Sequence, residues 1–298
     1  MSAPRPDILC IGAALWDVIG RSPGAMAPGA DVPGRIVAAP GGVALNIAVA
    51  LAGLGLRPAL LGAVGDDPEG AALAAALAAR GVGAAFLTRI PGIATDRYMA
   101  IEDPRGLVAA IADAHTLEAA GTAILAPLGD GRLGAAGAPW AGPVVIDGNL
   151  TEAVLAGIAA SPLFAAASLH IAPASPGKGA RLALLAAHPR ATLYVNRAEA
   201  EGIAAWPFAD AAAAAEALVA RGAARAVVTD GAAAAADAAR GRDTVVAPPP
   251  PVTVARVTGA GDVFLAAHLA AGLGGAPPDA ALATALAAAA AHVAGDTP

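Results

Sequence analysis

Cysteine is almost absent from this sequence of 298 residues, in which Cys10 is the one cysteine. A single cysteine excludes an internal disulfide framework, and the apolar, strand-like segment around Cys10 predicts that this side chain packs in a core. Residues 1–6 lack the apolar core of a signal peptide. The longer apolar stretches are interrupted by polar residues and prolines, so none predicts a membrane span. We therefore expect a cytoplasmic protein that has no membrane partner.

Charge is sparse as well, because 14% of the residues are charged, the net charge is −6 and no basic run occurs. This balance excludes proteins that coat nucleic acids, so we expect no nucleic-acid partner. The P-loop motif G-x4-G-K-[ST] is absent, which disfavours the classical P-loop kinases. The length allows one large domain or two ordinary ones, with a sizeable core.

A glycine-containing stretch is the most informative feature that is present. Residues 256–264 read RVTGAGDVF, and the apolar run 265–273 that follows predicts a helix. Gly259 and Gly261 allow a tight turn, and the unpaired N–H groups at the start of a helix attract an anion. Asp262 would lie in the first turn of this helix, where its carboxylate could take a proton from an attacking hydroxyl. The alternative is that Asp262 only stabilises the helix N-terminus.

Short apolar runs alternate with alanine-rich helical segments over most of the chain. This alternation predicts an α/β fold with a doubly wound, mostly parallel sheet. Ligands bind such sheets at the carboxyl ends of the strands, so polar residues at these ends are candidates for function. The residues that follow this rule are Asp147, Asn149, Asn196, Asp230 and Asp262.

The first predicted strand leads to further candidates. Asp17 follows this strand and could grip substrate hydroxyls, and a solvent-exposed aspartate in a turn is the alternative. Gly41 and Gly42 precede an apolar helix predicted over residues 43–54, and they let a ligand approach the backbone. Asn46 is the one polar residue of this helix, and a buried asparagine needs a hydrogen-bond partner.

Taken in order, these motifs resemble those of the ribokinase-like (PfkB) carbohydrate kinase family. Residues 41–48 are similar to its GG-x3-N-x-A signature and residues 258–262 to its glycine–aspartate element. The N-x-x-E at 196–199 and the V-T-x-G at 228–231 support the match. The resemblance covers essentially the whole chain and implies a single domain, residues 1–298, with a three-layer α/β/α fold and a mostly parallel central sheet.

The family also carries a small β-sheet lid. The resemblance implies that roughly residues 13–40 and 86–115 contribute this lid. Within the second segment, the sequence predicts strands over 86–89, 97–102 and 107–112. Relatives pair through their lids, so the resemblance also implies a homodimer.

The resemblance implies roles for individual residues of this chain. Asp262 would be the catalytic base, beside the amides of Gly259, Ala260 and Gly261 that stabilise the transferring phosphate. Glu199 would order a magnesium-bound water, so ATP and Mg²⁺ are the implied cofactors. The implied acceptor contacts are Asp17, Gly41, Gly42, Asn46 and Thr95, with Asp96 beside them as a loop residue of the same segment. The implied ATP contacts are Asn196, Thr229, Gly231, Thr258, Gly259 and Gly261.

Two further elements resemble the pseudouridine kinases within this family. Residues 147–150 (DGNL) are similar to their D-x-N-L element, which makes Asn149 a candidate substrate contact. Residues 173–178 (PASPGK) resemble a P-x-S-x-x-K element, whose Lys178 could reach a phosphate or a uracil carbonyl, unless it is an ordinary surface lysine. Ala172 replaces the aspartate that usually precedes this proline.

Arg256 is a departure of another kind. Many relatives have an aspartate two residues before the threonine at 258, and that aspartate is associated with a monovalent-cation site. A guanidinium group at this position would repel K⁺, which puts a monovalent-cation requirement in doubt. Pseudouridine kinases often lack this aspartate too.

The resemblance therefore implies an ATP-dependent kinase that phosphorylates the 5′-hydroxyl of pseudouridine, with Asp262 as the base. A small-molecule nucleoside or sugar and ATP would be its partners. Another PfkB-family enzyme, acting on a sugar or an ordinary nucleoside, is the first alternative. A catalytically silent nucleoside- or sugar-binding protein is the second, and the intact element at 259–262 argues against it.

Overall fold

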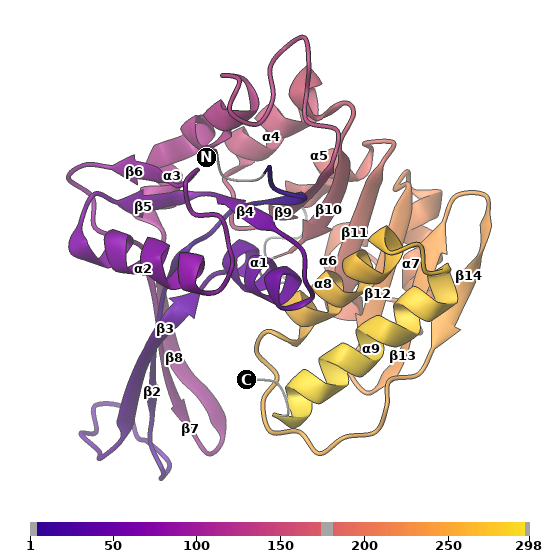
Figure 1. The fold of residues 1–298 in the computed structure, drawn as a ribbon. Coiled ribbons are helices and arrows are strands. Elements are labelled where there is room, and N and C mark those ends of the chain that lie inside the picture. Colours follow the sequence, from indigo (N-terminus) through magenta and orange to yellow (C-terminus); the bar gives the residue numbers. More distant parts are fainter. Residues whose placement is uncertain (1–4, 174–180, 296–298) are drawn as a thin grey trace.

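The computed structural model describes residues 5–173 and 181–295, and its centre is an eight-stranded sheet (Figure 1). The order is β14-β13-β12-β11-β10-β9-β1-β4, in which β13 is antiparallel to both β12 and β14 and all other neighbouring pairs are parallel. The mostly parallel sheet predicted from the sequence is confirmed. Its strands are β1 (Ile8–Ile11), β4 (Pro58–Leu61), β9 (Pro143–Asp147), β10 (Ser168–Ala172), β11 (Ala191–Asn196), β12 (Arg225–Asp230), β13 (Ala233–Ala239) and β14 (Arg242–Ala247).

Helices cover both faces of this sheet and create two cores. One helical layer contains α1 (Val43–Gly53), α2 (Pro68–Ala79), α8 (Ala260–Leu273) and α9 (Pro278–Ala294). The other contains α3 (His115–Ala120), α4 (Glu152–Ala160), α5 (Ala183–Ala186), α6 (Arg197–Ala204) and α7 (Ala211–Ala220), with the 3-10 helices η1 (Gly121–Leu128) and η2 (Pro162–Phe164). In the described part of the chain, no helix combines the length and the hydropathy that crossing a bilayer demands.

Strand β1 shows how one sequence serves both cores. Its side chains alternate between the two faces of the sheet, as they do in any strand. Ile8 and Cys10 enter the core under α1 and α8, whereas Leu9 and Ile11 enter the core on the other face. Cys10 is fully buried, which confirms its predicted role in packing.

A separate four-stranded sheet projects from one end of the body (Figure 1). Its order is β3-β2-β7-β8, and β2 and β7 are its parallel pair. Its strands are β2 (Leu15–Arg21), β3 (Arg35–Gly41), β7 (Arg97–Asp103) and β8 (Gly106–Asp113).

The strand predicted over residues 86–89 does not join this small sheet. The structure has β6 (Thr88–Ile90) instead, which pairs in parallel with β5 (Ala63–Gly65). The Thr88 amide donates to the Gly62 carbonyl (2.9 Å), and this contact helps to hold the strand against the body.

A buried charge network ties the antiparallel edge of the large sheet to α8. Asp237 on β13 has no exposed surface and accepts hydrogen bonds from Arg225 on β12 (2.6 and 2.8 Å) and from Arg242 on β14 (2.7 Å). His268 on α8 contacts the same network, with its Nε2 3.3 Å from Arg225 Nη2. Burial would raise the pKa of Asp237, but the hydrogen bonds from Arg225, His268 and Arg242 hold it well below its usual range.

Replacing this carboxylate should destabilise the fold. Asp237→Ala would leave two arginines without their counter-charge, and we expect the free energy of unfolding to fall by about 3–5 kcal/mol. Urea denaturation followed by circular dichroism measures this change. Asp243→Ala, on the exposed side of β14, is the matched control and should shift stability by less than about 0.5 kcal/mol. Equal stability of the Asp237→Ala protein and the wild type would contradict the expectation.

Candidate active site

The candidate active site lies where α8 begins. Gly259 precedes the helix with a φ of 84°, in the left-handed region that favours glycine. The Ala260 amide donates to the Val257 carbonyl (3.1 Å), and Asp262 lies in the first turn of α8, as the sequence predicts. The amides at this end of the helix carry its partial positive charge, so the turn suits an anion held beside a carboxyl group.

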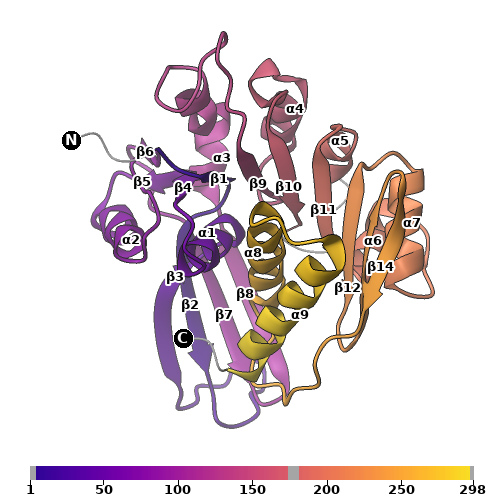
Figure 2. The same cartoon turned by 45° about the vertical axis from the view of Figure 1, so that its right-hand side comes forward.

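Asn46 on α1 contacts Asp262 on α8. The two helices pack against each other, and Figure 2 shows them side by side. Its Nδ2 donates to Asp262 Oδ2 at 3.0 Å, so the asparagine has the partner that its position requires. Burial raises the pKa of Asp262 to about 7, the charges of Asp147 and Asp17 add to this rise, and the Asn46 hydrogen bond opposes it. A carboxyl group whose pKa lies near neutrality is suited to proton transfer.

Asp17 reaches the site from the small sheet. It is a half-buried residue of β2, so the alternative of an exposed aspartate in a turn does not hold. Burial raises its pKa to about 6. Its carboxylate passes directly over Gly41, where a Cβ atom would lie 2.0 Å from Asp17 Oδ2, so any larger residue at 41 would displace it.

Asp147 ends β9 and has no exposed surface. Its Oδ2 accepts from the amides of Ala13 (2.9 Å) and Ala44 (3.3 Å), and its Oδ1 accepts from the amide of Asn149 (2.8 Å). Burial raises the pKa of Asp147, and these amide hydrogen bonds oppose the rise. The carboxylate therefore joins the β1–β2 connection, the start of α1 and the end of β9. The sequence marked Asp147 as a polar strand end and as part of the D-x-N-L element, and it did not predict the contacts with Ala13 and Ala44, because these residues are far away in the chain.

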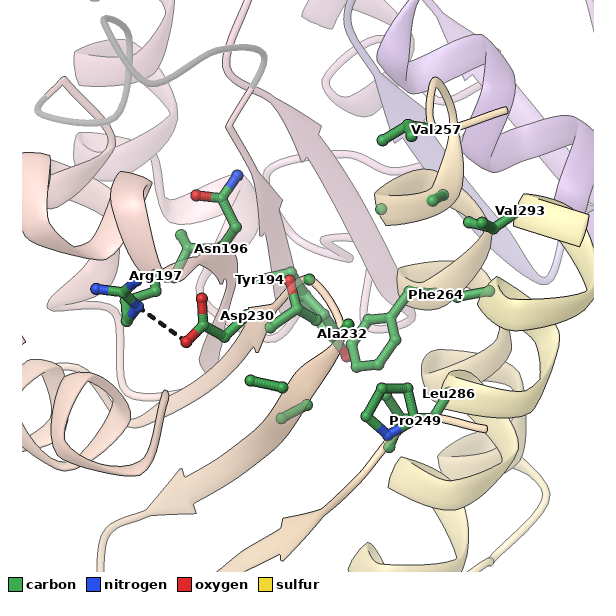
Figure 3. A pocket seen from close by; sticks show the side chains of 18 of the residues that line it. Tyr194, Asn196, Arg197, Asp230, Ala232, Pro249, Val257, Phe264, Leu286 and Val293 are labelled. Carbon is green, nitrogen blue, oxygen red and sulfur yellow. Dashed lines mark hydrogen bonds and ion pairs between the residues drawn. The ribbon is translucent and has the colours of Figure 1, made fainter. Parts of the chain in front are cut away.

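A cavity of about 1000 Å³ adjoins Asp262 and extends towards β11 and β12 (Figure 3). This volume suits a small-molecule ligand. Asn196 and Asp230 lie on one side of the cavity, opposite Phe264 and Val257 (Figure 3). The predicted ATP contacts that line the cavity are Asn196, Thr229, Gly231 and Gly261, while Thr258 and Gly259 lie in the adjoining turn before α8. The apolar wall comes from Tyr194, Pro249, Phe264, Leu286 and Val293, none of which the sequence analysis selected.

Asn196 and Glu199 form a capping box at the start of α6. Asn196 Oδ1 accepts from the Glu199 amide (2.9 Å), and Glu199 Oε2 accepts from the Asn196 amide (2.8 Å). Burial raises the pKa of Glu199, and the Asn196 amide opposes this. Magnesium retains most of its waters and needs one or two carboxylates beside the phosphates, so Glu199 on the cavity wall fits a water-mediated role. Among the described residues, no group of three or more His, Cys, Asp or Glu could hold a metal ion alone.

The hydroxyl of Thr95 has partners within the fold. It donates to Asp67 Oδ1 (2.6 Å) and accepts from the Gly65 amide (3.0 Å). Asp96 is buried in the same way and accepts from the amides of Thr116 (2.8 Å) and Leu117 (3.0 Å) at the start of α3. A contact of Thr95 with the acceptor stays a prediction.

The serine and the lysine of the P-x-S-x-x-K element have no described position. Ser175 and Lys178 belong to residues 174–180, which lie outside the described part of the chain. Asn149, from the other pseudouridine-kinase element, is half-buried next to Asp147.

A protein-family model and a known protein both match this chain. The family model described as pfkB family carbohydrate kinase matches residues 5–295. Pseudouridine kinase from Escherichia coli strain K12 is 34% identical over 152 residues, which are 51% of this chain and 47% of that protein. The match therefore spans about half of the relative's length.

Solved structures show the same fold. A carbohydrate kinase from Agrobacterium tumefaciens has a TM-score of 0.75 at 28% identity, with 95% of this chain and 89% of that chain covered. Arabidopsis thaliana ribokinase complexed with ribose and ATP has a TM-score of 0.78 at 20% identity, with 97% and 93% covered. The second likeness shows the fold alone, and it confirms the ribokinase-like α/β prediction. Because the family model extends over nearly the whole chain, this protein belongs to the pfkB family of carbohydrate kinases.

Proposed function

We propose that this protein is an ATP-dependent kinase that phosphorylates the 5′-hydroxyl of pseudouridine. The observation that carries the proposal is Asp262, a carboxyl group with a pKa near 7 at the start of α8, which borders a cavity of about 1000 Å³. The choice of pseudouridine is supported by the D-x-N-L element that contains Asn149 and by the partial match to the Escherichia coli pseudouridine kinase. Another sugar or nucleoside remains the second candidate acceptor, because the family contains both kinds of enzyme.

The reaction would use the chemistry of the α8 N-terminus. The backbone amides of Gly259, Ala260 and Gly261 would face the γ-phosphate and stabilise its charge during transfer. Asp262 would accept the proton of the acceptor hydroxyl as that oxygen attacks in line. Asn46 donates through Nδ2 to Asp262, so its Oδ1 would be the atom that accepts from a sugar hydroxyl.

The other site residues would bind and position the two substrates. Asp17 and the backbone at Gly41 and Gly42 would hold the acceptor, and Asn196, Thr229 and Gly231 would line the ATP site. Glu199 would hold a water of the Mg²⁺ that accompanies ATP, and this ion would supply positive charge that offsets the charge of the phosphates. The guanidinium group of Arg256 argues against a monovalent cation.

The small sheet would act as the lid. Asp17 lies on its inner face, so closure of this sheet would bring the carboxylate to the acceptor and exclude water from the phosphate. The opposite face carries apolar side chains that are exposed in the single chain, namely Ile36, Met99, Ile101 and Ile111. An exposed apolar patch of this kind favours a protein partner, and we propose a homodimer formed through this face. A cytoplasmic location is part of the same proposal.

An acceptor panel tests the function. ADP release with ATP and Mg²⁺ should be fastest with pseudouridine, compared with uridine, ribose and fructose 6-phosphate. Asp262→Asn should lower the turnover by about 100-fold or more because the base is lost, while the exposed Asp243→Asn serves as the matched control with wild-type activity. Turnover of a different acceptor would replace pseudouridine, and an unchanged Asp262→Asn rate would remove Asp262 as the base.

The pKa of Asp262 predicts a pH dependence. Its carboxylate is the active form, so kcat/KM should rise with pH and level off above about 7. Asn46→Leu removes a hydrogen bond that opposes the raised pKa, so the acidic limb should move to higher pH. Asp17→Asn removes a nearby negative charge and should move the acidic limb to lower pH, independently of its effect on the maximal rate. A limb near the ordinary aspartate value of about 4 would contradict this assignment.

The dimer proposal has its own measurement. We expect light scattering coupled to size exclusion to give the mass of two chains for the wild type. Met99→Glu together with Ile111→Glu places charge on the apolar face and should yield monomers. Val37→Glu lies on the other face of the same sheet and should leave the dimer intact. A monomeric wild type would rule the proposal out.

A further inference from the structure

We infer that Arg256 and His292 clamp the segment before α8, so that the Thr258–Gly259 peptide is held ready for the phosphates of the nucleotide. This inference rests on the proposed function and names two positioning residues. Neither residue lines the cavity. Both act through the backbone that leads to Gly259.

The clamp begins with the end of α9. The last carbonyls of a helix have no partner inside it. In α9, the Val293 carbonyl accepts from the amides of Ala255 (2.8 Å) and Arg256 (3.1 Å). The His292 carbonyl accepts from Arg256 Nε (3.0 Å). The segment that enters α8 therefore satisfies part of the end of α9, beside the Gly295 amide, and the guanidinium charge lies at the negative end of the helix dipole.

The imidazole of His292 completes the clamp. Its Nδ1 lies 3.2 Å from Arg256 Nη2, and its Nε2 lies 2.9 Å from the Thr258 carbonyl oxygen. A guanidinium only donates and a carbonyl oxygen only accepts, so Nδ1 must accept and Nε2 must carry the hydrogen. One neutral tautomer of His292 thus connects Arg256 to Thr258.

The contact with Thr258 fixes the orientation of one peptide group. The C=O and N–H of a planar trans peptide point in opposite directions. When His292 holds the Thr258 carbonyl, the Gly259 amide is turned away from α9. Gly259 also has a φ of 84°, and a Cβ at this position would lie 3.2 Å from His292 Nε2. The imidazole therefore packs on the glycine whose amide it orients.

Fixing the peptide in advance would strengthen phosphate binding. A turn that is ordered before the ligand arrives does not lose that conformational freedom on binding. The benefit concerns the β- and γ-phosphates, which would lie at the α8 N-terminus, and not the nucleobase in the apolar part of the cavity.

Calorimetric binding of a non-hydrolysable ATP analogue and of AMP, both with Mg²⁺, tests the clamp without any acceptor. Arg256→Met and His292→Phe should each lower the affinity for the ATP analogue about tenfold. Both should leave the affinity for AMP unchanged, because AMP lacks the β- and γ-phosphates. His292→Gln can still donate to the Thr258 carbonyl and should recover most of the affinity. Arg221→Met is the matched control, since Arg221 also donates to a backbone carbonyl but lies at the end of α7.

The double variant distinguishes a clamp from two independent contacts. The protein with both Arg256→Met and His292→Phe should bind the ATP analogue as tightly as the single variant that has the lower affinity, because either change breaks the same connection. Three outcomes would each overturn the inference. They are an unchanged affinity for the ATP analogue, an equal loss of affinity for the analogue and for AMP, and a loss in the double variant that equals the sum of the two single losses. These readouts need nucleotide binding only, so a wrong acceptor or an inactive protein would be recognised separately in the acceptor panel.

Discussion

The hydrogen bond from Asn46 to Asp262 joins the first turns of two helices that are more than 200 residues apart in the chain, at a sequence separation of 216. Each helix starts at a glycine with a positive φ, Gly42 for α1 and Gly259 for α8. At Gly42 a Cβ would lie 2.5 Å from the Ala13 carbonyl oxygen. The backbone conformation at these two glycines therefore determines where the two helices start and so positions Asn46 and Asp262. The packing of α1 on α8 brings the two side chains into contact.

Neighbouring carboxyl groups take different roles because their partners differ. Asp147 is enclosed by backbone amides and joins separate segments, which makes it structural. Asp262 has one amide donor from Asn46 and lies near two other carboxyl groups, so its proton affinity rises towards neutrality. Burial raises the pKa of both groups, but backbone amides already engage both oxygens of Asp147, so Asp262 is the one suited to accept a proton.

The sequence predicted the parts of this arrangement that depend on local pattern. Alternating apolar runs predicted the parallel sheet, and the glycines before Asp262 predicted the start of α8. The network around Asp237 was not predicted, because its partners come together only through the antiparallel register of β12, β13 and β14. The strand at 86–89 was placed in the wrong sheet for the same reason, since a short apolar run does not encode which strand it pairs with. The resemblance implied an acceptor contact for Thr95, and the hydrogen bond of its hydroxyl to Asp67 was not predicted because the two residues are 28 positions apart in the chain.

The small sheet carries Asp17, whereas Asp262 belongs to the body of the molecule. The negative charge of Asp17 is one of the influences that raise the pKa of Asp262. If the small sheet swings outward, it takes this charge with it, and the Coulomb energy between the two groups falls with distance. The base would then be weaker in the open molecule and stronger in the closed one. If the sheet closes as proposed, the proton affinity of Asp262 would rise with that closure.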